Sequence, residues 1–161
     1  MIKLINIFYN TNQTEEYIIP NVGETVVAPL NSLQTVNNGD KIPLVNIKDN
    51  KVFALTKQLW MVTAQYQCGK KGNQDDTLCV WFRKNGVDVP SACATASLTT
   101  EGDSCNFPLT FNISMNKCDY LEFLMCNNIG QIGIFASLQG SPTITTPLCP
   151  GIIVNITTIT D

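Results

Sequence analysis

The chain has 161 residues, of which 44% are hydrophobic and only 14% are charged, and its formal net charge is −3. That length suits one domain with an ordinary buried core. The negative balance excludes a general nucleic-acid-binding protein, because neutralising phosphates requires clustered Lys and Arg. No apolar run is long enough to span a membrane as a helix. The charged share lies well below the roughly 25% of typical domains. It suits a surface covered by contacts with copies of itself or with other proteins.

Residues 1–25 carry the weakest pattern. We expect an N-terminal arm, a first strand or a segment that anchors the chain on a neighbour, followed by the main domain at residues 26–161. The N-terminal stretch reaches polar Asn10 too early for a signal peptide and has no small-residue cleavage site. We therefore expect a chain made in the cytoplasm.

The next segments favour strands over helices. Residues 24–45 contain Pro29 and Pro43, which break a helix. Residues 51–67 are long enough for a helix, but their β-branched and aromatic content favours a strand. The remaining strand candidates are residues 78–84, 87–89, 93–100, 107–115, 120–126, 132–139 and 151–160. Short strands with turn signals between them, at this spacing, predict an all-β sandwich or barrel.

The segment Val80–Ala92 (VWFRKNGVDVPSA) predicts a hairpin. Asn85-Gly86 is the typical pair for a type I′ turn, which needs positive φ at both central positions. A phosphate site at Arg83 and Lys84 is the alternative. It would require several glycines leading into a helix N-terminus, and the sequence has none here. We expect the charges near the turn to face water.

Several motifs resemble the tumour-necrosis-factor-like (TNF-like) jelly rolls, the superfamily that includes the globular heads of complement proteins. The Val80–Ala92 hairpin resembles the family's strand–Asn-Gly–strand element, in particular the versions in large-virus and phage structural proteins. Residues 55–68, 111–126 and 132–160 resemble further strands in the same order. The sequence departs from the family pattern at Cys118, before Asp119, and at Leu59, where the family usually has glycine.

The resemblance implies a two-sheet antiparallel jelly-roll sandwich of about eight to ten strands that assembles as a homotrimer. The candidate trimer-interface residues are Trp81, Tyr120, Phe123 and Phe135. Strand alternation leaves open whether each residue lines the threefold axis or belongs to the protomer's own core.

The seven cysteines include no Cys-x-x-Cys pair, and the chain has no histidine. A structural zinc site is therefore not expected. The cysteines are either small buried hydrophobes or partners in disulfides, and the sequence leaves both open. In the jelly roll that the resemblance implies, Cys79 and Cys126 lie on neighbouring antiparallel strands. The resemblance thus makes Cys79–Cys126 a candidate intrachain disulfide.

Catalysis is not expected. Without histidine, the Ser–His–Asp and Cys–His arrangements are absent. The carboxylates fall mainly on turns, where they are usually solvated. Asp75-Asp76 and the segment 101–103 contain oxygen ligands that Ca²⁺ prefers, but neither has the acidic density of a dedicated loop. We predict no enzyme activity, no metal and no cofactor.

The sequence thus predicts a non-enzymatic homotrimer on a virus particle, as a minor capsid, cap, decoration or fibre-head protein. Its expected location is the virion and its expected partners are capsid or other virion proteins. The alternative is a receptor- or carbohydrate-binding head of a viral fibre or bacterial surface protein, with a host receptor or glycan as partner. The candidate outer-contact loops are Gly69–Asp76, Thr99–Ser104 and Asn127–Gly130.

Overall fold

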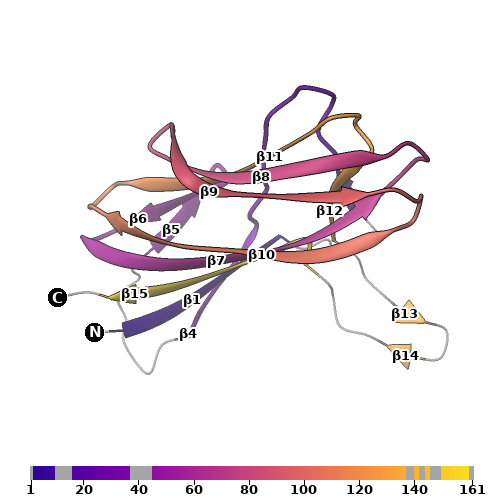
Figure 1. The fold of residues 1–161 in the computed structure, drawn as a ribbon. Helices are drawn as coiled ribbons and strands as arrows, with labels where there is room; N and C mark the ends of the chain where they lie inside the picture. Colours follow the sequence, from indigo (N-terminus) through magenta and orange to yellow (C-terminus); the bar gives the residue numbers. More distant parts are fainter. Residues whose placement is uncertain are drawn as a thin grey trace.

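The computed structural model describes residues 2–9, 16–36, 45–136, 140–141, 144–145 and 150–159. Over these residues the chain forms strands and turns with no helix, so none is present that could cross a membrane. Two antiparallel sheets pack face to face, and the start of the first strand and the end of the last strand lie at the same end of the sandwich (Figure 1). The predicted all-β, two-sheet jelly roll is confirmed.

The larger sheet is organised around β7 (Gln58–Lys70). One edge of β7 pairs with β10 (Ser104–Met115), and the other edge pairs first with β15 (Ile152–Ile159) and then with β12 (Ile132–Ala136). The remaining strands of this sheet are β2 (Glu16–Ile18) beside β12, β1 (Ile2–Tyr9) beside β15, and β4 (Ser32–Val36) beside β1.

The smaller sheet is organised around β11 (Tyr120–Asn127) and β8 (Asp76–Lys84). On one side, β9 (Val87–Leu98) pairs with β8. On the other side, β6 (Lys51–Ala54) and β3 (Val26–Val27) both pair with β11, and β5 (Val45–Lys48) pairs with the outer edge of β6. A separate two-stranded ribbon joins β13 (Gly140–Ser141) to β14 (Ile144–Thr145).

The alternation along β7 divides its side chains between core and surface. Trp60, Val62 and Tyr66 are fully buried, whereas Leu59 and Met61 are 42% and 47% exposed. A two-residue period is the period of a strand, and it would mix these two groups on a helix. The strand interpretation of this segment is therefore correct, and residues 51–67 contain no helix.

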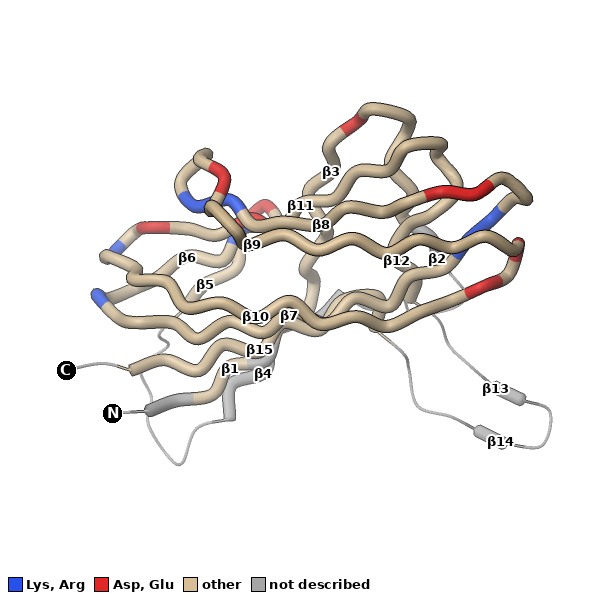
Figure 2. Tube along the Cα trace, in the orientation of Figure 1, with Lys and Arg blue, Asp and Glu red and all other residues tan. Residues whose placement is uncertain are grey.

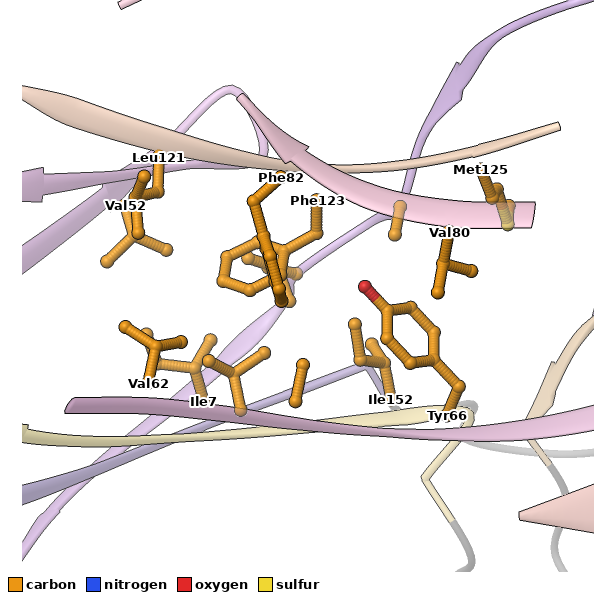
Figure 3. Packing of buried hydrophobic residues seen from close by; sticks show 14 of the residues in the cluster. Ile7, Val52, Val62, Tyr66, Val80, Phe82, Leu121, Phe123, Met125 and Ile152 are labelled. Carbon is orange, nitrogen blue, oxygen red and sulfur yellow. The ribbon is translucent and has the colours of Figure 1, made fainter. Parts of the chain in front are cut away.

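Aromatic rings fill the space between the two sheets (Figure 3). The ring of Phe82, from β8, lies 4.2 Å from that of Phe111 on β10 and 5.0 Å from that of Phe123, which it meets edge to face. Further along the larger sheet, the rings of Tyr66 on β7 and Phe107 on β10 stack with their centroids 5.4 Å apart. Edge-to-face and offset pairs add to the large apolar area that each ring buries.

The first strand belongs to this sandwich. β1 is paired with β15 along one edge and with β4 along the other, and Ile5 and Ile7 are fully buried. Its backbone and the side chains of Ile5 and Ile7 are therefore engaged within the sandwich, so Ile2–Tyr9 is a strand of the larger sheet. Residues 10–15 lie outside the described part of the chain.

Replacing Phe82 with alanine should lower the free energy of unfolding by roughly 3–5 kcal/mol, because the ring bridges both sheets and leaves a cavity when removed. Urea denaturation followed by tryptophan fluorescence measures this change. Val87→Ala is the matched control, since Val87 is 70% exposed; it should change stability by less than about 0.5 kcal/mol. Equal effects of the two substitutions would contradict this account of the core.

Candidate functional site

The outer face of the larger sheet carries no charged side chain along four rows that cross its strands. Residues directly opposite each other in an antiparallel pair share one face of the sheet, so the register gives each row. The rows are Ser114, Leu59 and Ile159; Asn112, Met61, Thr157 and Leu4; Thr110, Thr63 and Asn155; and Pro108, Gln65 and Ile153. We call this surface the uncharged face. Figure 2 shows that Lys, Arg, Asp and Glu gather toward the ends of the sandwich and not along β7, β10 and β15.

Exposed apolar side chains gather at one end of the uncharged face. Leu4, Leu59, Met61 and Ile159 are between 39% and 48% exposed. A pocket of about 230 Å³ adjoins them, lined by Lys57, Gln58, Leu59, Ser114, Met115, Asn116 and Ile159. Exposed apolar side chains next to a pocket form a surface that can be complementary to the surface of another protein.

The Asn85-Gly86 turn joins β8 to β9, with φ of 50° at Asn85 and 81° at Gly86. Both residues have the positive φ that a type I′ turn requires. The Arg83 guanidinium donates to Asp88 at 2.8 Å, and the resulting hydrogen bond lowers the pKa of that carboxyl. The Lys84 ammonium bonds to the Ser114 carbonyl at 2.7 Å. Both cations at this tip are engaged by protein oxygens, so they do not form a phosphate cradle.

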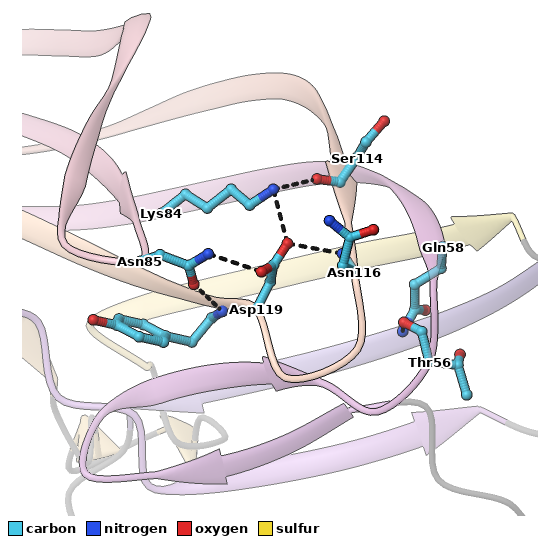
Figure 4. Close-up of polar contacts among 8 residues, drawn as sticks. Thr56, Gln58, Lys84, Asn85, Ser114, Asn116 and Asp119 are labelled. Atoms are coloured by element: carbon cyan, nitrogen blue, oxygen red, sulfur yellow. Dashed lines mark hydrogen bonds and ion pairs between the residues drawn. The ribbon is translucent and has the colours of Figure 1, made fainter.

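Asp119 is the centre of the polar contacts behind this turn (Figure 4). Its carboxylate accepts from Lys84 Nζ at 2.9 Å, from the Asn116 backbone N–H at 2.8 Å and from Asn85 Nδ2 at 2.8 Å. Burial acts to raise the pKa of Asp119, but these three donors outweigh it and lower the pKa to about 2. The network joins the β8–β9 turn to the β10–β11 loop, and Cys118 within that loop has a φ of 71°.

Asp76 holds the opposite end of the sandwich together. Its residue is 3% exposed, and its two carboxylate oxygens accept from the backbone N–H groups of Thr77, Asn128, Ile129, Gln131 and Ile132 at 2.8 to 3.1 Å. Burial acts to raise the pKa of this carboxyl, but the N–H donors prevail and lower it. A carboxylate that already accepts five N–H bonds has little capacity left for Ca²⁺. The described residues also include no group of three or more His, Cys, Asp or Glu that could hold a metal ion.

The three predicted outer-contact loops come together at this end. The Lys70 backbone N–H donates to the Asp103 carbonyl at 3.0 Å, and that of Lys71 donates to the Gln131 carbonyl at 2.9 Å. The Lys70 ammonium, which is nearly fully buried, bonds to the carbonyl of Gly72 and to the Gln131 side chain. The sequence indicated these loops separately, but only the fold makes them one surface.

The four predicted trimer-interface residues do not share a surface. Phe123 is fully buried against Phe82, and Phe135 is 7% exposed on β12. Trp81 and Tyr120 are half-buried on the smaller sheet, where Tyr120 packs against Phe53. Phe123 thus belongs to the protomer's own core, because it points between the sheets. Sequence analysis missed the uncharged face, since its rows depend on the pairing of β7 with β10 and β15.

Two pairs of cysteines lie directly opposite each other. Cys79 on β8 faces Cys126 on β11, as the resemblance implied, and both are free thiols in the structure. Cys68 on β7 faces Cys105 on β10, a pairing that the sequence analysis did not identify. Neither pair has a close spacing along the chain, so only the strand register reveals them. Cys149 lies outside the described residues.

Known structures share this fold over nearly the whole chain. Two crystal structures of murine APRIL, at pH 8.5 and pH 8.0, match with TM-scores of 0.54 and 0.55. Sequence identity is 9% and 8%, and each match covers 99% of this chain and 100% of the murine chain. APRIL is a TNF-family protein; the chain therefore has the TNF-like jelly-roll fold that the resemblance predicted. No protein-family model and no curated protein matches the sequence.

Replacing Asp76 with asparagine should lower the free energy of unfolding by roughly 2–4 kcal/mol, because the amide removes the charge and places an N–H group against N–H donors. Chemical denaturation measures the loss. Asp75→Asn makes the same charge change at an exposed neighbour and should be nearly neutral. If both variants are equally stable, Asp76 does not hold this end of the sandwich.

The contribution of Asp119 should depend on pH. Its folded-state pKa of about 2 lies below its ordinary value. Its stabilisation is therefore complete above the unfolded pKa of about 3.9 and is lost as pH falls through the folded pKa. Asp119→Asn should cost about 1 kcal/mol at pH 7, and the gap to the wild type should close between about pH 4 and pH 2. Val87→Ala, which removes no ionisable group from an exposed position, should show no such closing in an acid denaturation series. A pH-independent gap for Asp119→Asn would contradict the assignment.

Proposed function

We propose that this protein is a non-enzymatic, homotrimeric jelly-roll protein that acts by assembly, as a structural component of a virus particle. The observation that carries the proposal is the uncharged face. It spans strands β10, β7 and β15 and extends to Leu4 on β1, and it carries four partly exposed apolar side chains beside a pocket.

A second copy of the chain is the partner that suits this face. Interface cores are depleted in charged residues, because an unpaired charge is costly to remove from water. The rows of the uncharged face contain Thr, Asn, Gln and Ser, whose groups donate and accept hydrogen bonds without that cost. In a ring of three copies, each copy would cover the apolar end of its neighbour's uncharged face. Because the ring closes, no copy is left with this end exposed to water.

The proposed setting on a virus particle draws on the sequence. The Val80–Ala92 hairpin resembles the versions in large-virus and phage structural proteins, and the charged share of 14% suits a chain with many protein contacts. In that setting the uncharged face would join protomers, and the loop end around Asp76 would meet the neighbouring virion protein.

A recognition head is the second candidate, and the loop end favours it. Val22 and Ile129 are 66% and 42% exposed there. Gly130 lies beside the Val22 side chain, and Asp76 holds the backbone of the same loop. Apolar side chains on a fixed loop provide a preorganised contact for a ligand. A glycan or receptor array separates the two candidates: specific binding that is lost in Ile129→Lys supports a recognition head.

The assembly proposal predicts that Met61→Lys converts a trimer into a monomer. Met61 is 47% exposed among the apolar side chains at one end of the uncharged face, and burying three lysines around one axis would cost several kcal/mol through desolvation and repulsion. Light scattering at several concentrations measures the native mass. Val87→Lys makes the same kind of change on the hairpin of the other sheet and should remain trimeric. A wild-type chain that is monomeric at all concentrations would overturn the proposal, and presence in purified particles would test its setting.

A further inference from the structure

Cys68 and Cys105 form a pair of thiols inside one end of the larger sheet. They are direct partners in the register of β7 and β10. Both side chains point into the sandwich, where Cys68 is fully buried and Cys105 is partly exposed. The next inward pair along the same two strands is Tyr66 with Phe107, whose rings stack at 5.4 Å. The Cys68 and Cys105 side chains therefore lie on the core side of the two paired strands, next to this ring stack.

The backbone already has the spacing that a disulfide needs. Directly opposed residues of antiparallel strands have Cα atoms about 4.5–5.5 Å apart, which lies within the range of about 4.4–6.8 Å seen across disulfides. The two thiols lie close enough that each shifts the pKa of the other. Because the two residues are direct partners in the register, closing a disulfide here does not require one strand to slide along the other.

We propose that Cys68 and Cys105 are a redox-active pair that closes as a disulfide between β7 and β10 when the protein meets a small-molecule disulfide such as oxidised glutathione. The pair differs from Cys79 and Cys126, which lie on the outer side of the smaller sheet, and it does not depend on the proposed trimer.

Two exchange steps account for all atoms and electrons. The Cys105 thiolate attacks one sulfur of the oxidant R–S–S–R, forms a Cys105–S–S–R mixed disulfide and releases R–S⁻, which takes up a proton. Cys68 then loses its proton, and its sulfur attacks the Cys105 sulfur and expels the second R–S⁻. The two cysteines are oxidised by two electrons in total, and the small disulfide is reduced to two R–SH.

The environment assigns the two roles. Cys105 is the more accessible thiol, and the hydrogen bond from Cys68 outweighs the effect of burial and lowers the pKa of Cys105 to about 7. The hydrogen bond to Cys105, with burial, raises the pKa of Cys68. Cys105 is therefore partly ionised at neutral pH and reacts first, while Cys68 is kept away from outside reagents and only completes the bond.

The disulfide would secure an edge of the sandwich. Among the described strands of the larger sheet, β10 pairs only with β7. It also supplies part of the uncharged face through its outward residues. A covalent link at Cys68–Cys105 ties this edge to the central strand next to the Lys70–Asp103 backbone bond, so oxidation should stabilise the end where the loops meet.

The test is to expose the reduced full-length protein to oxidised glutathione at pH 7.5, block remaining thiols with N-ethylmaleimide, and map the peptides without reductant. Digestion with trypsin and Glu-C places Cys68 and Cys105 on separate peptides without any other cysteine, because Lys57 and Lys70 flank Cys68 and Glu101 and Lys117 flank Cys105. We expect the peptide Gln58–Lys70 joined to Gly102–Lys117, a product two hydrogens lighter, and a Tm higher by roughly 5–10 °C.

Two variants sharpen the result. Cys79→Ala/Cys126→Ala should form the same bond, whereas Cys105→Ala should lose it. Cys68→Ala should shift the pH midpoint of Cys105 alkylation from about 7 toward its ordinary value, because the hydrogen-bond donor is gone. Recovery of Cys68 and Cys105 as free thiols in the oxidised wild type would overturn the proposal. So would Cys105 carrying glutathione alone, or an alkylation midpoint unchanged by Cys68→Ala.

Discussion

The pairing of β7 along both of its edges is the constraint on which the rest of the structure depends. Because β10 occupies one edge and β15 and β12 occupy the other, the side chains of β7 can point only into the sandwich or away from it. Trp60 and Tyr66 therefore lie on the same side as the Phe82 ring, and Leu59 and Met61 face outward. A slip of one residue in this register would exchange the core with the uncharged face.

Two carboxylates fix the loops at the two ends of this sandwich. Asp119 accepts hydrogen bonds from one backbone N–H group and two side chains, whereas Asp76 accepts from five backbone N–H groups. Asp119 joins the β8–β9 turn to the loop before β11, and Asp76 holds the loop after β11. An ionised carboxylate is a strong acceptor, so Asp76 fixes several N–H groups of irregular backbone, and Asp119 fixes one such group together with two side chains. In a chain with few charges, these two acidic side chains serve the fold itself.

This chain shares its fold with structures that are only 8–9% identical in sequence, so the architecture by itself does not indicate the function. A two-sheet jelly roll requires alternation, turns and a filled core, and many sequences meet those requirements. What a particular member does depends on side chains that the fold leaves outside. Here these are the neutral rows of β10, β7 and β15, the exposed pair Val22 and Ile129 at the loop end, and a thiol pair that reaches the surface only through Cys105.

The sequence by itself determined the features that depend on near neighbours. The two-residue period of residues 58–70, the Asn85-Gly86 turn and the breaks between strands identified an all-β sandwich, because each reflects local backbone preferences. The family motifs extended this to the jelly roll and to the facing of Cys79 and Cys126. Only the tertiary structure decided which distant residues meet. Asp76 bonds to backbone more than 50 positions away, Cys68 lies opposite Cys105, and Phe123 is buried between the two sheets. Alternation tells that a strand has two faces, but register and packing between strands far apart in the chain decide what each face touches.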